Sequence, residues 1–97
     1  MKITWSPRSK SQLNDIAEYI ALDKPTAAYR WLENLFKAVE KLELFPKSGR
    51  KVPEFNQEDI REIIFGNYRI IYKIKEEEII IASVRHGKQL LDNNEIK

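Results

Sequence analysis

Residues 60–84, IREIIFGNYRIIYKIKEEEIIIASV, decide the fold of this chain. Within them lie three runs rich in Ile, Tyr and Val, the residue types that favour strands: 60–65, 68–75 and 79–84. Gly66-Asn67 suits a tight turn between the first two runs, and the three glutamates at 76–78 suit a solvated turn before the third. The stretch therefore predicts a three-stranded antiparallel meander.

The run 68–75 alternates as a strand with two unlike faces does. Every second residue from Tyr68 to Ile74 is apolar, whereas three of the other four residues of the run are Arg or Lys. One face of this strand is thus expected to line the core and the other to be mostly polar. The run 79–84 is apolar in both alternating sets, which indicates a strand in the interior of the sheet.

The N-terminal residues predict one short strand followed by a helix. Residues 2–5 form the candidate strand. Ser6-Pro7 then suits a helix start, because Ser caps a first turn and Pro fits the first helical position. Apolar side chains recur behind it with helical spacing: Leu13, Ile16, Ala17 and Ile20. We expect a helix over 7–22.

A second helix is predicted over 25–44, antiparallel to the first across a short link. Pro25 fits its first turn, and its apolar face is broader than that of the first helix. It must end before Pro46, because the residue preceding a proline is disfavoured in the α region. The two helices and the meander should share one buried set: Leu13, Ile16, Ile20, Leu32, Leu35, Val39, Ile70, Tyr72 and Ile81.

Residues 46–58 contain two prolines and a glycine without periodicity, which predicts a long loop. The order of strand, helix hairpin and meander gives an α+β fold with the helices packed on one sheet face. At 97 residues the chain is expected to be one domain over 1–97, with 92–97 as a C-terminal tail.

The composition excludes several kinds of site. The chain has no cysteine and one histidine, so neither a disulfide framework nor one of the usual zinc clusters is expected. Its three glycines are scattered, which excludes a glycine-rich phosphate loop, and no serine has a neighbouring base motif. No apolar run approaches the ~18 residues of a membrane span. We expect a cytoplasmic protein without a metal, a cofactor or a membrane partner.

The net charge of +2 hides an uneven distribution. Residues 24–51 carry seven Lys or Arg against three Glu, a local +4, whereas 52–67 carry one Arg against four acidic residues, a local −3. Segregated charge can steer an anionic partner such as nucleic acid, although charged helix faces are usually just solvated.

The β half of the chain holds the candidates for chemistry. Neighbouring strands of a meander would bring Arg61, Arg69 and Arg85 within reach of one another. Clustered guanidinium groups suit a phosphodiester, and a histidine such as His86 is the side chain that moves protons near neutral pH. RNA cleavage is one reading of this set.

Structural roles fit the same residues. Charge and strand spacing offer these alternatives: Arg69 paired with Glu62 across the sheet, Arg61 paired with Glu54 or Asp59, His86 at a strand end, and Tyr68 and Tyr72 in the core. The residues alone therefore indicate a small basic α+β domain that binds nucleic acid or protein.

Several short motifs follow one another along the chain: 3–7 (ITWSP), 15–20 (DIAEYI), 25–28 (PTAA), 45–50 (FPKSGR) with 52–54 (VPE), 61–62 (RE) with 67–72 (NYRIIY), and 84–88 (VRHGK). In this order they resemble the toxins of the RelE/ParE superfamily, over residues 3 to about 91. The resemblance implies the RelE/ParE fold. It also implies that the chain is the toxin of a type II toxin–antitoxin module, neutralised by a small cognate antitoxin.

The superfamily divides by target, into ribosome-dependent mRNA endonucleases of RelE type and ParE-like poisons of DNA gyrase. Arg69 matches the arginine of the Tyr-Arg pair in the nucleases. Ile60 and Glu62 stand where those enzymes carry lysines, and residues 89–91 lack their C-terminal tyrosine. His86 lies about one position from the histidine of some nucleases. These departures favour the ParE-like branch, which acts on gyrase and is not an enzyme.

Three hypotheses follow. In the favoured one, the C-terminal stretch binds the target, through Arg85, His86, Lys88 and Leu91. In the second, an endoribonuclease acts on the ribosome and mRNA, with these catalytic residues: Arg61, Arg69, Arg85 and His86. In the third, the chain is a basic interaction module without toxicity.

Overall fold

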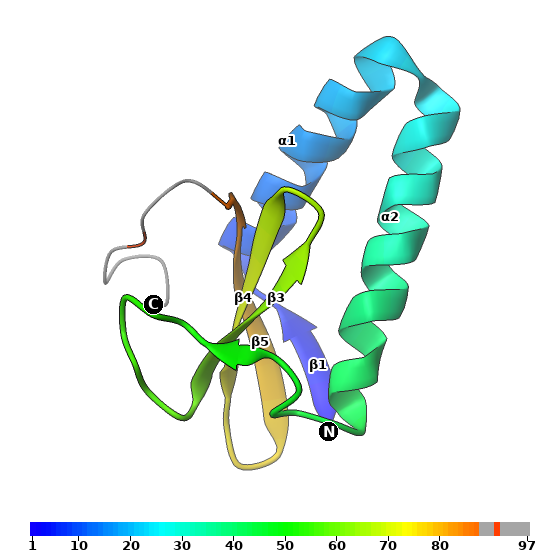
Figure 1. The fold of residues 1–97 in the computed structure, drawn as a ribbon. Helices are drawn as coiled ribbons and strands as arrows, with labels where there is room; N and C mark the ends of the chain where they lie inside the picture. Colours follow the sequence, from blue (N-terminus) through cyan, green and yellow to red (C-terminus); the bar gives the residue numbers. More distant parts are fainter. Residues whose placement is uncertain (88–90, 92–97) are drawn as a thin grey trace.

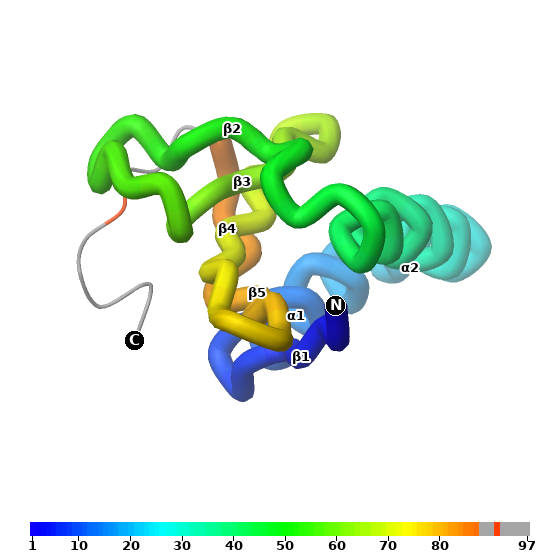
Figure 2. The backbone as a smooth tube through the Cα atoms, turned by 90° about the horizontal axis from the view of Figure 1, so that it is seen from below, coloured from blue at the N-terminus to red at the C-terminus, as the bar shows by residue number. Residues whose placement is uncertain are grey.

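A five-stranded sheet carries the two helices on one face (Figures 1 and 2). The computed structural model describes residues 1–87 and Leu91. The elements follow in this order: β1 (Lys2–Trp5), α1 (Pro7–Asp23), α2 (Pro25–Glu40), the 3-10 turn η1 (Lys41–Glu43), β2 (Arg50–Lys51), β3 (Ile60–Phe65), β4 (Tyr68–Ile74) and β5 (Glu78–His86). The α+β fold with a helix hairpin and a meander is confirmed.

The strands lie in the order β1-β5-β4-β3-β2. The three strands of the meander pair antiparallel, whereas β1 pairs parallel to β5, so the strand predicted at 79–84 is interior as expected. Strand β2 was missing from the prediction, which treated 46–58 as loop throughout. It has only two residues, both exposed, and gives no alternation to detect.

The helix boundaries agree with the local chemistry. The Ser6 hydroxyl accepts the Ser9 N–H at 3.1 Å, and Pro7 is the first helical residue. Lys24 has extended backbone (φ −144°, ψ 111°), because Pro25 follows it, and this residue separates the two helices. The α-helical part of the second helix ends at Glu40 rather than near 44, and η1 continues it for one tighter turn.

Most of the predicted core is buried. The main cluster lies between the helices and one sheet face, and includes these residues: Leu13, Leu35, Val39, Leu42, Ile70, Tyr72, Ile79, Ile81 and Val84. Ile16, Ile20 and Leu32, which we expected to be buried, are only half-buried. Ile16 and Leu32 still pack against the main cluster, whereas the far end of the hairpin extends beyond the end of the sheet (Figure 1).

A second, smaller cluster covers the opposite face of the sheet. Val52, Ile60, Ile71 and Leu91 are buried there, with Phe55 packed against them. The residue order on β4 explains the arrangement, because Ile71 points away from the face that carries Ile70 and Tyr72. The face predicted to be mostly polar therefore has an apolar centre, closed by the 52–55 loop and by Leu91.

Candidate functional site

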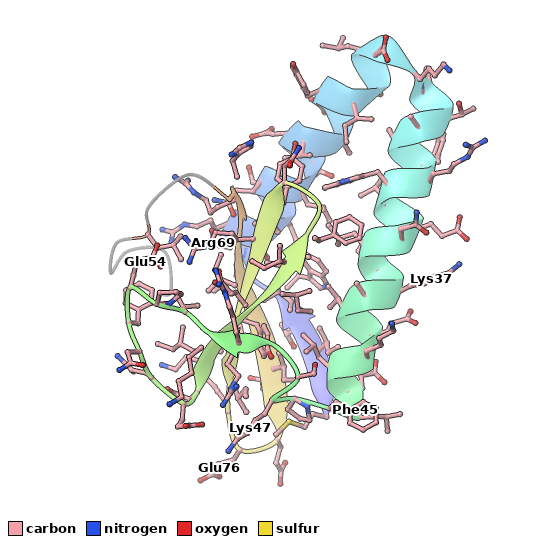
Figure 3. All side chains as sticks on the ribbon, viewed as in Figure 1. Lys37, Phe45, Lys47, Glu54, Arg69 and Glu76 are labelled. Atoms are coloured by element: carbon pink, nitrogen blue, oxygen red, sulfur yellow. The ribbon has the colours of Figure 1, made fainter. Side chains whose placement is uncertain are left out.

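Arg69 lies at the centre of an ion network on the face of the sheet away from α2 (Figure 3). Its Nε donates to Glu62 Oε1 at 2.5 Å. Its two terminal nitrogens donate to the two oxygens of Glu54, at 2.7 and 2.8 Å. Strand pairing places Glu62 on β3 beside β4, and the loop after β2 supplies Glu54. One guanidinium thus binds two carboxylates.

The network continues through a second arginine. Arg50 Nε donates to the other oxygen of Glu62 at 2.7 Å, because β2 places Arg50 directly opposite Glu62. The side chain of Glu62 has no exposure to solvent, and that of Arg69 is 6% exposed. A buried charge must be paired and hydrogen-bonded, and the alternating order Arg50, Glu62, Arg69, Glu54 meets that requirement with no net charge.

The ion pairs shift the pKa values of both partners at one end of the network. Hydrogen bonding to Arg69 lowers the pKa of Glu54 from 4.5 to about 2, against an opposing effect of burial. The hydrogen bonds that Arg69 donates, first of all to Glu54 and then to Glu62, raise the pKa of Arg69 above its ordinary value. Both groups are therefore charged at neutral pH.

This pairing limits what Arg69 can do chemically. An arginine that neutralises a scissile phosphate must direct free N–H groups at its oxygens. The Nε and both terminal nitrogens of Arg69 already donate to carboxylates, and the nearby charge of Glu62 and Glu54 would repel a phosphodiester. The predicted pairing of Arg69 with Glu62 is confirmed.

Arg61 is not part of this network. It pairs across the sheet with Tyr72, three positions from Arg69 along β4, and so belongs to the other sheet face. Its guanidinium binds the Glu58 carboxylate at 2.7 Å and the Gly49 carbonyl at 2.9 Å. The expectation that Arg61 joins Arg69 and Arg85 is therefore wrong, as is its pairing with Glu54 or Asp59.

Lys51 also binds Glu58, at 2.9 Å. Together with Arg61 it lowers the pKa of this exposed carboxyl. The two ion pairs of Glu58 tie the loop after β2 to β3, without contact to the network around Arg69.

The remaining candidates lie at the end of β5. Arg85 is the strand partner of Arg69, and His86 is the partner of Tyr68, with ring centroids 5.9 Å apart. His86, Tyr68, Arg69 and Arg50 border a hollow of about 390 Å³. The sheet thus brings Arg69, Arg85 and His86 together. Lys88 lies outside the described residues.

Leu91 departs from its predicted place on an exposed surface, because its side chain is buried in the second cluster. Its backbone N–H donates to Glu54 Oε2 at 3.1 Å. Leu91 therefore lies against the loop that follows β2, with its side chain among Val52, Ile60 and Ile71.

Sequence reasoning did not assign Arg50 and Glu54 to the site. The signal was the change of charge at residue 52, where a basic segment meets an acidic one. Arg50 lies on one side of that boundary and Glu54 on the other, and both reach the same sheet face. Without β2 in the prediction, nothing placed Arg50 opposite Glu62 or Glu54 beside Arg69.

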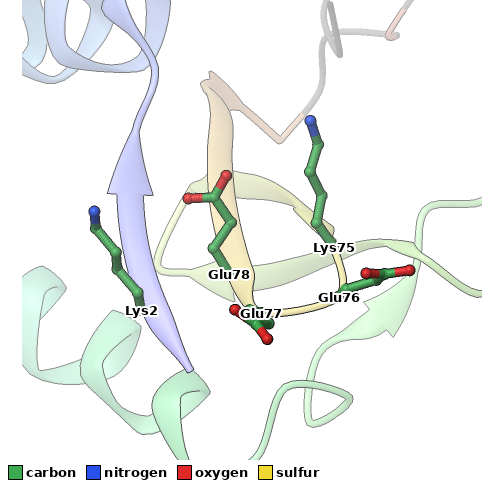
Figure 4. A pocket seen from close by; sticks show the side chains of 5 residues that line it. All are labelled: Lys2, Lys75, Glu76, Glu77 and Glu78. Atoms are coloured by element: carbon green, nitrogen blue, oxygen red, sulfur yellow. The ribbon is translucent and has the colours of Figure 1, made fainter.

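A second hollow, of about 550 Å³, does not form a site of converging groups. It lies at the β4–β5 turn and is lined by Lys2, Lys75, Glu76, Glu77 and Glu78. Figure 4 shows that these side chains point in different directions. Among the described residues, no group of three or more His, Asp or Glu is placed to hold a metal ion. Within the same residues, no helix has the length and apolar character to cross a membrane.

Comparison with known proteins identifies a protein family, a relative and a solved structure that this chain resembles. The sequence model of the family described as "ParE toxin of type II toxin-antitoxin system, parDE" matches residues 3–91. The toxin Y4kP of Sinorhizobium fredii is 32% identical over 90 residues, which cover 91% of this chain and 90% of that protein. A chain of the chromosomal ParDE system from P. aeruginosa shares the fold, with a TM-score of 0.73 and 19% identity over 89% of this chain and 95% of that one.

Proposed function

Because the chain belongs to the ParE toxin family of type II toxin–antitoxin systems, we propose that it inhibits growth by poisoning DNA gyrase. It acts through a protein–protein contact, and does not cleave nucleic acid. The family implies an antitoxin partner, and in our proposal that antitoxin neutralises the toxin by covering its surface. This makes the chain a binding protein rather than an enzyme.

The observation that carries the proposal is the pairing of Arg69. The arginine that matches the nuclease branch is buried and donates to two carboxylates. Glu62, which stands where those nucleases carry a lysine, has a fully buried charge that holds Arg69. The network therefore makes the one nuclease-like residue a structural one, which supports the gyrase branch over mRNA cleavage.

The proposed target-binding surface is the stretch from Arg85 to Leu91. Arg85 and His86 are the last side chains of β5, and His86 is exposed. Lys88 follows them in sequence and adds a cation. The buried Leu91 contributes by fixing the end of this stretch rather than by touching the target. A cationic stretch of this kind fits an acidic patch on a protein surface.

The test measures both activities with the same purified protein. We expect inhibition of gyrase supercoiling by the wild type and no ribosome-dependent mRNA cleavage. His86→Ala should raise the concentration for half-maximal gyrase inhibition by about tenfold, the effect of losing one strong interface contact. Arg30→Ala, which removes an exposed cation on α2, should leave it unchanged.

Two results would reject the proposal. One is mRNA cleavage that disappears in Arg69→Ala while gyrase stays active, which would establish the nuclease instead. The other is a wild type that inhibits neither process, which would favour a module without toxicity.

A further inference from the structure

The outer edge of β3 is open beyond Glu62. Strand β2 pairs with β3 only at Arg61 and Glu62. Among the residues that the structure describes, no strand continues the sheet beside 63–65 on that side. An edge without a neighbour presents its backbone N–H and C=O groups to any chain that lies beside it. This part of β3 can therefore accept a further strand.

The backbone of Ile64 is the part of this edge that faces outward. The Asp59 carbonyl accepts the Ile74 N–H, on the β4 side, at 2.8 Å. The next carbonyl, that of Ile60, accepts the Val52 N–H on the β2 side at 3.2 Å. Because the direction of these bonds alternates along an antiparallel strand, the even-numbered residues of β3 face away from β4. Ile64 thus directs its N–H and C=O to the open edge, and its side chain is 52% exposed.

Arg50 lies where the open edge begins, and part of its guanidinium is unused. Its Nε donates to the buried carboxylate of Glu62 at 2.7 Å, which fixes the orientation of the group. Its two terminal nitrogens form no hydrogen bond within the described part of the chain, and its side chain is 59% exposed. A planar guanidinium that is already oriented binds a carboxylate through two parallel N–H groups.

A hollow of about 360 Å³ lies along the same edge. Its apolar lining includes Ile63 and Ile64 of β3, and α2 supplies Lys41. Of the charged residues around it, Lys41 and Arg50 are exposed, whereas Glu62 is buried and paired. The charges that the hollow presents to a partner are therefore both positive.

We propose that this edge of β3 is a docking site for an extended, acidic peptide segment of a partner protein. The segment adds as a short strand and exchanges backbone hydrogen bonds with Ile64, while an apolar side chain enters the hollow. A carboxylate of the segment binds the terminal nitrogens of Arg50. The inference goes beyond the proposed function, because it uses no residue of the surface proposed for gyrase.

The open edge favours a peptide over a nucleic acid. Ile64 offers one donor and one acceptor in the spacing of a β-strand, and a phosphodiester backbone has no N–H to donate to its carbonyl. The exposed apolar side chain of Ile64 also suits a peptide side chain better than a phosphate. The two cations then favour an acidic peptide over a basic one, since complementary charge selects the partner.

An NMR titration of the full chain, labelled with ¹⁵N, compares three probes. The first is a peptide of about six residues, the common length of a strand, in which Glu alternates with Val. The second has Lys in place of Glu, and the third is an oligothymidylate of the same length. We expect the acidic peptide alone to shift the Ile64 amide and the Arg50 Nε–H together, and to bind more weakly as salt is added.

Two variants and a matched control locate the site. Arg50→Gln should raise the Kd of the acidic peptide about tenfold, the effect of losing a hydrogen bond between charged groups. This variant also removes a partner of Glu62, so its titration is run at a temperature at which its spectrum shows it folded. Ile64→Glu keeps all four members of the ion network and places a carboxylate at the edge, which should raise the Kd at least as much. Leu44→Glu makes the same change at a residue that is 80% exposed and outside the hollow, and should leave the Kd unchanged.

Three outcomes overturn the proposal. An acidic peptide that leaves the Ile64 amide unshifted shows that the edge accepts no strand, even if the Arg50 signal moves. An equal response to the basic peptide or to the oligothymidylate shows that the edge does not select an acidic peptide. Equal weakening in Ile64→Glu and Leu44→Glu shows only an effect of net charge. None of these measurements involves gyrase, so their outcome is independent of the proposed function.

Discussion

At Glu62 a carboxylate without exposure to solvent lies between the guanidinium groups of Arg50 and Arg69. Removing one member of such a set leaves the others buried and underpaired, which typically costs 3–5 kcal/mol. We expect Glu62→Gln to lower the free energy of unfolding by about 3 kcal/mol. Urea denaturation monitored by Trp fluorescence measures this change.

Glu33→Gln is the matched control for Glu62→Gln. Glu33 forms an exposed pair with Lys37 at 3.4 Å. Lys37 points outward from α2 (Figure 3), and ion pairs this exposed contribute below about 1 kcal/mol to stability. If the two variants lose similar amounts of stability, the buried network does not hold the sheet as described.

The lowered pKa of Glu54 sets a pH dependence of stability. Between pH 4.5 and about 2 the unfolded chain binds a proton at Glu54 that the folded chain does not. The stabilisation is therefore complete above this window and is lost as the pH falls through it. The shift corresponds to about 3 kcal/mol. We expect the stability difference between wild type and Glu54→Gln to shrink as the pH is lowered from 6 to 3, in urea denaturation at each pH. A difference independent of pH would contradict the shift.

The residues of the network were only partly predictable from the sequence. The pair of Arg69 and Glu62 was one of the alternatives that charge and strand spacing offered, because the turn at Gly66-Asn67 places the two strands side by side. Arg50 and Glu54 lie in a segment without periodicity, where no rule sets which face a side chain joins. Their places depend on tertiary contacts of the loop, which the sequence pattern does not encode.

At the scale of the elements, the segment between η1 and β3 packs closely on β3 and β4 at Gly49. The Gly49 N–H donates to the Tyr72 hydroxyl at 3.0 Å, and this hydroxyl donates to the Pro46 carbonyl at 2.7 Å. A Cβ on Gly49 would lie 2.6 Å from the Glu62 carbonyl oxygen and 2.6 Å from the Tyr72 hydroxyl. Only glycine allows the loop to pack on β3 and β4 at this point.

We expect Gly49→Ala to lower the free energy of unfolding by about 3 kcal/mol, because backbone atoms of β3 must move to admit the methyl group. Gly66→Ala is the comparison. Gly66 has φ +58° and open space where its Cβ would be, so its cost is the left-handed strain alone, about 1 kcal/mol. Urea denaturation of both variants shows which one loses more free energy of unfolding. A larger loss in Gly66→Ala would contradict the packing described for Gly49.

The elements themselves were more predictable than the site. Both helices and the three long strands have enough residues for their periodicity to show, and Ser6-Pro7 and Pro25 mark helix starts. The parallel pairing of β1 with β5 and the short β2 were not predicted. A strand of two or four residues carries too little pattern to determine its partner.

At the scale of the whole molecule, the helix hairpin extends beyond the end of the sheet (Figure 1). Its far end carries three large, exposed side chains, Tyr19, Leu22 and Tyr29, at 74%, 85% and 74% exposure. Tyr19 and Leu22, together with Ile20, Asp23 and Ala27, line a hollow of about 530 Å³. Apolar surface of this kind, rimmed by charged residues, is typical of a protein-binding site.

We expect the cognate antitoxin to cover this end of the hairpin together with a sheet edge, because an amphipathic segment can lay its apolar face into such a groove. Hydrogen exchange in residues 7–44 should slow when the antitoxin is added. Leu22→Ala should raise the Kd of the complex by about tenfold, as loss of a central apolar contact does. Leu44→Ala is its control, since Leu44 is 80% exposed and lies near the other end of α2. Unchanged exchange in residues 7–44, or an equal effect of the two variants, would place the antitoxin elsewhere.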